Sequence, residues 1–267
     1  MKVLPGIAFG CGLRNRGQSF VGSDGVLGLG RGPISLVTQV GTEFSYCLVD
    51  FFELPARESY LTIGPASIPL PPNNNASSPL AALQYTPMLR NPFAETPYYI
   101  GIEGVRVDGR LLAIPAEVWR IDPAGNGGTI LDSGTTLSAF LQPAYDPIFA
   151  AISESLAASG LPSLATPPAQ GFELCVNATG IEPRVLSERL PKLSFVMSGG
   201  ATFDPPPNGN VFISVDPSAE TKCLGLRGIR STAGFSVLGN LIQQNFVFVF
   251  DNRNSRLGFA GPTDCHS

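Results

Sequence analysis

This chain of 267 residues has little histidine, little charge and no long apolar run. Its single histidine, His266, lies beside the C-terminus, which leaves no positioned imidazole for Ser-His-Asp or Cys-His catalysis. With 17 Lys and Arg against 21 Asp and Glu the net charge is −4, and no basic cluster occurs, so nucleic acid is not expected as a partner. The longest apolar run, residues 246–250, is far shorter than the roughly 20 residues of a transmembrane helix, and no membrane partner is expected.

The cysteines offer no metal or redox motif. None of the five forms a Cys-x-x-Cys pair, which argues against structural zinc and thioredoxin-like chemistry; they are Cys11, Cys47, Cys175, Cys223 and Cys265. The glycine-rich run at 28–33 ends in Pro33, so it does not match a dinucleotide-binding loop. No cofactor or metal is therefore expected. From the residues alone, buried reduced thiols and disulfides both remain open.

Glycine and proline are abundant, with 30 and 25 residues, and they separate short β-branched and aromatic segments. This pattern favours an all-β protein with many turns. Strands are expected at 7–11, 44–49, 60–63, 98–107, 110–114, 193–197 and 211–215. Helices are expected at 33–40 and 142–158, the second with Pro143 in its first turn. The stretch 65–79 loses apolar periodicity and reads as a surface loop.

One short motif carries a candidate catalytic group. Thr129, Ile130 and Leu131 read as a buried strand that delivers Asp132 into a turn formed by Ser133, Gly134, Thr135 and Thr136. Gly134 is expected to permit a tight turn, and the hydroxyls of Ser133 and Thr135 to fix the carboxylate. An Asx turn, in which the aspartate only caps its own backbone, is the alternative interpretation.

Further motifs in the same order decide between these interpretations. The segments 235–240, 246–251 and 256–260 read as a strand, a glycine turn and a closing hairpin, and Asp132 stands upstream of them. This arrangement resembles the C-terminal lobe of pepsin-like aspartic proteases. The segments 9–12, 25–32 and 44–49 resemble the nepenthesin-type branch of that family in plants. The resemblance covers nearly the whole chain and implies an all-β, pepsin-like bilobal β-barrel fold.

The resemblance also implies a mechanism and a disulfide pattern. Family members use two aspartates that share a proton, one activating water and the other donating to the scissile carbonyl. Asp132 would be one of them, with Ser133 bracing the opposite loop and Thr135 orienting the Asp132 carboxylate. By resemblance, Cys175 would pair with Cys223 and Cys47 with Cys265, leaving Cys11 for a partner upstream.

The second aspartate is expected outside this chain. The fold repeats an apolar-apolar-Gly turn, at 26–28 and again at 237–239. Asp132 precedes Gly239 by 107 positions, and the same spacing before Gly28 falls ahead of Met1. The chain is therefore expected to hold residues 1–91 as a remnant of the N-terminal lobe and residues 92–267 as the C-terminal lobe. The substrate-covering flap would also be missing, so the chain alone is expected to be inactive.

The expected function is that of an aspartic endopeptidase that hydrolyses peptides or proteins at acid pH. It would be a monomer, and the full-length protein would be secreted or vacuolar, since Asn75 and Asn177 lie in N-glycosylation sequons although residues 1–12 lack a signal-peptide pattern. An alternative is a non-catalytic pepsin-like binding or inhibitor protein. Pairing of two copies through Asp132 is a further alternative, which the asymmetric remnant at 1–91 disfavours.

Overall fold

The structure is a computed structural model that describes residues 4–14, 25–41, 43–50, 58–64, 83–164, 171–215, 220–231, 233–263 and 265. Most of its regular elements are short strands, as the glycine and proline content predicts. The loop expected at 65–79, the sequon residue Asn75 and His266 lie outside the described residues. Asn177, in the other sequon, is exposed at the end of a strand.

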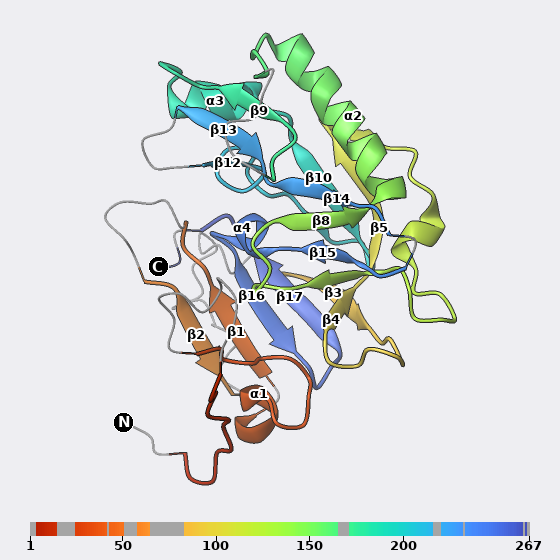
Figure 1. The fold of residues 1–267 in the computed structure, drawn as a ribbon, viewed down its shortest axis with the longest axis vertical. Helices are drawn as coiled ribbons and strands as arrows, with labels where there is room; N and C mark the ends of the chain where they lie inside the picture. Colours follow the sequence, from red (N-terminus) through yellow and green to blue (C-terminus); the bar gives the residue numbers. More distant parts are fainter. Residues whose placement is uncertain are drawn as a thin grey trace.

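A sheet of ten strands forms the centre of the molecule, in the order β14-β8-β15-β7-β4-β3-β17-β16-β1-β2. The strands are β1 (Glu43–Cys47), β2 (Tyr60–Ile63), β3 (Gln84–Leu89), β4 (Tyr98–Ile100), β7 (Thr129–Leu131), β8 (Ser138–Leu141), β14 (Leu226–Ile229), β15 (Ser236–Leu238), β16 (Val247–Asp251) and β17 (Arg256–Ala260). Figure 1 shows β1, β2 and the short helix α1 (Leu36–Val40) together at one end of the molecule.

Two smaller sheets belong to the C-terminal part. One has the order β11-β10-β5-β6 and the other β12-β13-β9. Their strands are β5 (Ile102–Val107), β6 (Arg110–Leu111), β9 (Cys175–Asn177), β10 (Leu193–Met197), β11 (Thr202–Phe203), β12 (Phe212–Ser214) and β13 (Thr221–Leu224). The β5–β6 hairpin turns at Asp108 and Gly109, whose φ angles of 49° and 79° suit this dipeptide.

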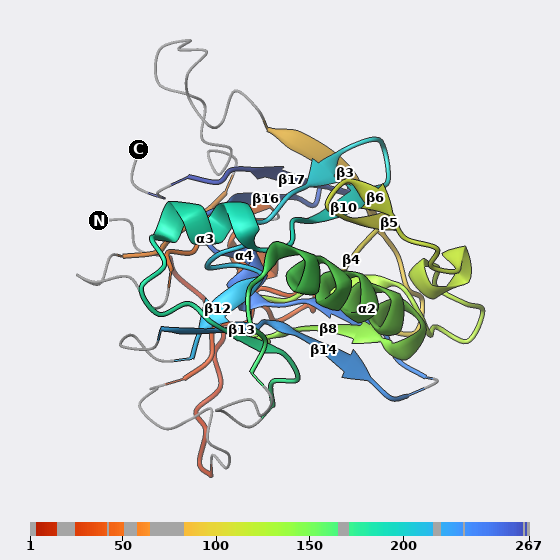
Figure 2. The ribbon, with the colours of Figure 1, turned by 90° about the horizontal axis from the view of Figure 1, so that it is seen from above.

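The long helix α2 (Gln142–Ser159) follows β8 directly. It has Pro143 in its first turn and ends before Gly160, whose φ of 70° is the usual left-handed helix end. Its buried face packs on β14, β8 and β5, which confirms the expected core-facing stripe. The remaining helices are η5 (Ala116–Trp119), α3 (Pro183–Arg189) and α4 (Asn240–Gln243); Figure 2 shows α2 and α3 on the same side of the molecule.

An aromatic core joins the N-terminal segment to the rest of the sheet. β1 pairs antiparallel with β16 over five residues, from Glu43 opposite Asp251 to Cys47 opposite Val247. The rings of Phe44 and Phe250 stack with centroids 4.2 Å apart. All five residues of β1 are buried, so the apolar content of residues 43–47 is explained by this contact.

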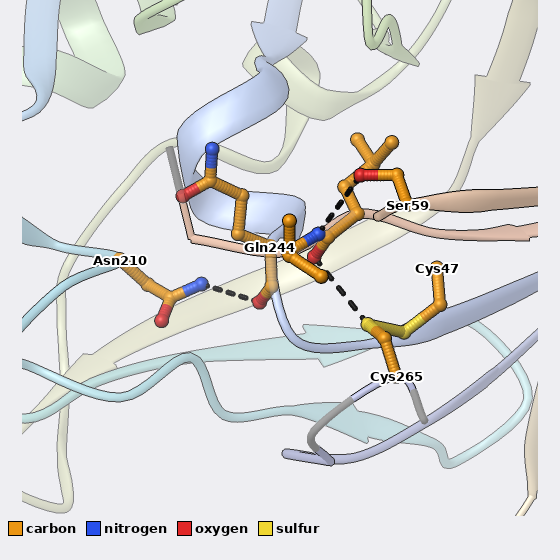
Figure 3. The surroundings of a disulfide bond; sticks show 7 residues. Cys47, Ser59, Asn210, Gln244 and Cys265 are labelled. Atoms are coloured by element: carbon orange, nitrogen blue, oxygen red, sulfur yellow. Dashed lines mark hydrogen bonds between the residues drawn. A yellow bond between two sulfur atoms is a disulfide. The ribbon is translucent and has the colours of Figure 1, made fainter. Parts of the chain in front are cut away.

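The structure contains two disulfides, Cys47–Cys265 and Cys175–Cys223. The first links β1 to the end of the chain, and Figure 3 shows it beside Ser59, Asn210 and Gln244. The Asn210 side-chain amide donates to the Gln244 backbone oxygen at 2.7 Å. Cys11 is free and exposed.

Several local expectations were wrong. Residues 7–11, where a strand was expected, form none, and among the described residues no strand lies against them. The strand expected at 110–114 ends at Leu111, and the helix expected from Pro33 begins at Leu36 with Ser35 as its N-cap.

Candidate active site

Asp132 stands at the end of β7, in the middle of the ten-stranded sheet. β7 pairs parallel with β15 on one side and antiparallel with β4 on the other. The parallel pairing continues one residue further, because the backbone N–H of Asp132 donates to the Leu238 oxygen at 3.0 Å. The position of Asp132 is therefore set by two flanking strands, and its carboxylate is partly exposed.

Two hydrogen bonds hold the Asp132 carboxylate. The Thr135 hydroxyl donates to Oδ2 at 2.6 Å and the backbone N–H of Gly134 donates to Oδ1 at 2.9 Å. A Cβ at position 134 would lie 3.1 Å from Oδ1, so glycine leaves the closest fit beside the carboxylate without displacing it. Both bonds favour one rotamer and leave the carboxylate accessible on its other side.

Ser133 does not take the place that the motif suggests. We expected its hydroxyl to hold the carboxylate, but that second bond comes from the Gly134 backbone. The Ser133 hydroxyl faces Tyr46, and its backbone oxygen accepts from the Asn240 side chain at 2.9 Å. Ser133 thus connects the turn of Asp132 to β1 and to α4.

The residues that follow Asp132 pack closely against Gly239, which comes directly after β15. The N–H of Gly239 donates to the Ser138 hydroxyl at 3.0 Å, and the N–H of Asn240 donates to the Thr135 oxygen at 2.6 Å. A Cβ on Gly239 would lie 2.7 Å from backbone atoms of both Thr135 and Leu137. Only glycine fits at this crossing, which explains why an apolar-apolar-Gly turn accompanies the aspartate.

Tyr46, in strand β1 of the N-terminal segment, contacts the turn formed by residues 132–136. Its buried hydroxyl makes a short hydrogen bond to Gln243 Oε1, and Gln243 in turn donates to the Leu238 oxygen at 2.9 Å. Burial raises the pKa of Tyr46 well above its ordinary value, the Ser133 bond acts in the opposite direction, and the nearby Asp132 charge adds to the increase. Tyr46 therefore stays a neutral phenol beside the site.

Two cavities flank the turn formed by residues 132–136. A cavity of about 360 Å³ lies between Asp132 and the N-terminal glycine segment, Val26 to Gly30, with Phe44 and Tyr46 in its wall. A second, of about 670 Å³, opens on the other side of Ser133 and Thr135 and includes Arg227, Ile213 and Leu241. Asp132 is the only carboxylate among the residues that line these two cavities. Within the described residues no group of His, Cys, Asp and Glu could hold a metal ion.

The N-terminal glycine segment is tied to the loop before β4. The Arg31 guanidinium donates to the Pro97 oxygen at 2.5 Å, and the Tyr98 hydroxyl donates to the Leu29 oxygen at 2.7 Å. Val26 and Leu27, the first two residues of this segment, are 81% and 58% exposed. They are not paired in any strand, unlike Val237 and Leu238.

The structure brings the predicted residues Asp132 to Thr136 into one turn, and it adds residues that the motif search did not select for a site. These are Tyr46, Ser138, Arg227, Asn240 and Gln243. Tyr46 and Asn240 belong to segments singled out by resemblance, so their positions carried a signal. Arg227 carried none, because nothing in the local sequence places it in a cavity with Ser133 and Thr135.

Comparison with known proteins agrees with this arrangement. A family model described as "Xylanase inhibitor C-terminal" matches residues 97–261, and one described as "Xylanase inhibitor N-terminal" matches residues 1–65. Aspartyl protease family protein 2 of Arabidopsis thaliana is 33% identical over 98% of this chain and 50% of its own length. Aspartic proteinase nepenthesin-2 of Nepenthes gracilis is 32% identical over 98% of this chain and 55% of its own length. The chain thus spans about half the length of these curated relatives.

Solved structures show the same fold. A structure named edgp aligns with a TM-score of 0.70 at 20% identity, over 90% of this chain and 60% of that one. Conglutin gamma, a basic 7S globulin from lupine seeds, aligns with a TM-score of 0.65 at 24% identity, over 92% and 60%. The all-β pepsin-like fold expected from the sequence is confirmed. Among the described residues, no helix is long and apolar enough to cross a membrane.

Proposed function

Because the chain belongs to the plant pepsin-like aspartic proteases, we propose that it carries the Asp132 half of the catalytic centre of an aspartic endopeptidase. The observation that supports this most strongly is the carboxylate itself. It accepts from Thr135 and Gly134, keeps one side open and lies between two cavities large enough for side chains of a peptide. An aspartate that only caps its own backbone in an Asx turn does not require an accessible side or neighbouring cavities.

The proposed reaction uses two carboxylates with one shared proton. The ionised carboxylate takes a proton from a bound water, whose oxygen attacks the scissile carbonyl carbon, while the protonated carboxyl donates to the carbonyl oxygen. The tetrahedral intermediate then collapses, the amide nitrogen is protonated and the C–N bond breaks. Thr135 and Gly134 would hold Asp132 in position throughout these steps.

We place the second carboxylate outside residues 1–267, at the cavity that Val26 to Gly30 border. That cavity already has Asp132 in its wall, and Val26 and Leu27 expose apolar side chains beside it. The 267-residue chain alone is then inactive, and residues 1–91 and 92–267 belong to different lobes. We further propose a monomeric, secreted or vacuolar full-length protein that acts on peptides or proteins.

The test is cleavage of an unfolded protein substrate at acid pH by the natural full-length protein and by the 267-residue chain. The full-length form is expected to cleave, and Asp132→Ala to lower kcat by about 10³-fold or more. Asp204→Ala, at an exposed aspartate outside both cavities, is the control and should change nothing. Activity of Asp132→Ala would refute the assignment of the site, and activity of the 267-residue chain would refute its inactivity.

A second candidate is a binding or inhibitor protein, and the names of the two matching family models favour it. The same assay separates the two functions. A well-folded full-length protein that cleaves nothing, with a substituted partner for Asp132, would support binding in place of hydrolysis.

A further inference from the structure

We propose that Arg227 makes the larger cavity a site for an acidic side chain of the substrate, so that it sets a preference for Glu or Asp at one position near the scissile bond. This inference rests on the proposed endopeptidase function and specifies its substrate class. Arg227 would be a specificity residue that contacts substrate, and it would take no part in the proton transfers.

The strand β14 directs Arg227 into this cavity. β14 pairs parallel with β8, with Arg227 opposite Ala139. Its neighbour Gly228 faces α2, because a Cβ there would lie 2.7 Å from the Tyr145 ring and 2.8 Å from the Gln142 side-chain oxygen. Successive side chains of a strand point to opposite faces, so Arg227 points away from α2 and lines the cavity beside Ser133 and Thr135.

Arg227 has no protein partner for its charge. Among the described residues its exposed guanidinium makes no ion pair or hydrogen bond, whereas Arg110 and Arg256 each meet a carboxylate at 2.7 Å. No Asp or Glu lines the cavity. Its apolar wall is made of Leu137, Phe172, Ile213, Val215 and Leu241. A guanidinium at the edge of such a wall suits a ligand with a short apolar stem and a carboxylate, which it can bind in a bidentate manner.

A second cation, Lys222 in the β12–β13 pair, also favours an acidic side chain in the cavity. Lys222 Nζ donates to the Ser214 hydroxyl at 2.6 Å, and Ser214 lines the cavity. Burial lowers the pKa of Lys222, and the Asp50 charge acts in the opposite direction. Because the Ser214 oxygen accepts from Lys222, its hydroxyl proton can be donated toward a ligand.

Three carboxylates belong to the surroundings of this cavity without lining it. Asp132 occupies the adjoining turn, where Thr135 and Gly134 hold it. Glu173 follows Phe172 in sequence and interacts with the Tyr145 phenol, and Asp50 acts on the charge of Lys222. None of the three lines the cavity, so its charged wall residue is a cation.

The experiment measures peptide binding by the natural full-length protein. Peptides blocked at both ends, so that they carry no terminal carboxylate, contain a reduced scissile bond and either Glu or Gln at one position, moved in turn along the sequence. At pH 5.5 the wild type is expected to bind the Glu peptide about tenfold more tightly than the Gln peptide at one position. At pH 3 the ratio should approach one as Glu is protonated, while a sulfonate side chain keeps its advantage.

Variants test whether Arg227 is responsible. Arg227→Gln should abolish the preference, Arg227→Lys should keep part of it, and Arg230→Gln, an exposed arginine outside the cavity, should leave it unchanged. Equal dissociation constants for Glu and Gln peptides at every position, or a preference that survives in Arg227→Gln, would overturn the proposal. If peptides with an ordinary bond are bound but never cleaved, the endopeptidase proposal fails, and the ratio of dissociation constants still decides the role of Arg227.

Discussion

Two segments of this chain carry the same apolar-apolar-Gly pattern and end in different structures. Val237 and Leu238 are 8% and 1% exposed, because β15 pairs with β7 on one side and β8 on the other. Val26 and Leu27 are 81% and 58% exposed and belong to no strand. The difference teaches that such a segment becomes a strand only where neighbouring strands satisfy its backbone and cover its side chains.

The N-terminal segment is joined to the rest of the sheet by β1, which pairs with β16, and by Cys47–Cys265, while a hydrogen bond from Tyr98 to the Leu29 oxygen holds its glycine segment. The strand β7, which ends before Asp132, is instead paired along both edges, with β15 and with β4. Four predictions test whether the N-terminal segment and the part around Asp132 differ in how strongly the rest of the fold stabilises them.

The largest effect on stability is expected from the disulfides. Replacing both cysteines of a pair by serine should lower the free energy of unfolding by about 5 kcal/mol for Cys47–Cys265, which closes 218 residues, and by about 4 kcal/mol for Cys175–Cys223, which closes 48. Urea unfolding measures the loss, and peptide mapping without reduction tests the pairing itself. Cys11→Ser is the control. Equal stability without Cys47–Cys265 would show that the N-terminal segment is secured by β1 alone.

The two glycine turns give a matched pair. Gly239→Ala places a methyl group 2.7 Å from the backbone of Thr135 and Leu137, and should cost about 3 kcal/mol. Gly28→Ala meets no atom within 4 Å and should change stability by less than about 0.5 kcal/mol in this chain. The same urea experiment measures both. A large loss for Gly28→Ala would mean that the two turns are equally enclosed.

The junction between β1 and β16 should depend on pH through Asp251, whose carboxylate is buried and meets Arg256 at 2.7 Å. Burial alone would raise the pKa of Asp251, but hydrogen bonds from Asn254 and Arg256 outweigh it and the pKa is lowered. The ionised Asp251 carboxylate therefore contributes fully to the free energy of unfolding above its unfolded pKa of about 3.9. This contribution is lost as pH falls through the pKa of the folded state.

Asp251→Asn should consequently cost about 2 kcal/mol at pH 6, because the new amide has no charge and only one accepting oxygen, so it cannot accept all the bonds that Arg256 and Asn254 donate to the two carboxylate oxygens. The gap to the wild type should shrink below pH 4, as measured by unfolding at a series of pH values. Asp204→Asn serves as the exposed control. A gap that stays constant down to pH 3 would refute the assigned role of the Asp251 charge.

The smallest effect is expected at Leu27. Leu27→Ser should change the stability of the 267-residue chain by less than about 0.5 kcal/mol, since the side chain is already exposed, while Leu238→Ser should cost about 3 kcal/mol. Repeating both in the natural full-length protein sharpens the comparison. If Leu27→Ser then costs as much as Leu238→Ser, further chain covers Leu27 there.

Much of the C-terminal part could be predicted because its signals are local. The apolar run before Asp132 and Pro143 at the start of α2 are each read within a few residues, and the structure contains the elements they predict. The bonds from Thr135 to Asp132 are equally local. The role of Ser133 was not, because its partners Tyr46 and Asn240 are distant in sequence.

The sequence by itself determined the turn at residues 132–136, the family and the all-β class, since these depend on residue types at short, regular spacing. Only the tertiary structure decided which apolar segment is a strand, which atoms cross at Gly239, and that Arg227 shares a cavity with the turn of Asp132. The physical reason is that strands are stabilised by partners far away in the chain. The backbone hydrogen bonds of a helix join residues close in sequence. Whether Val26 and Leu27 form a strand depends instead on a partner strand that their own sequence does not specify.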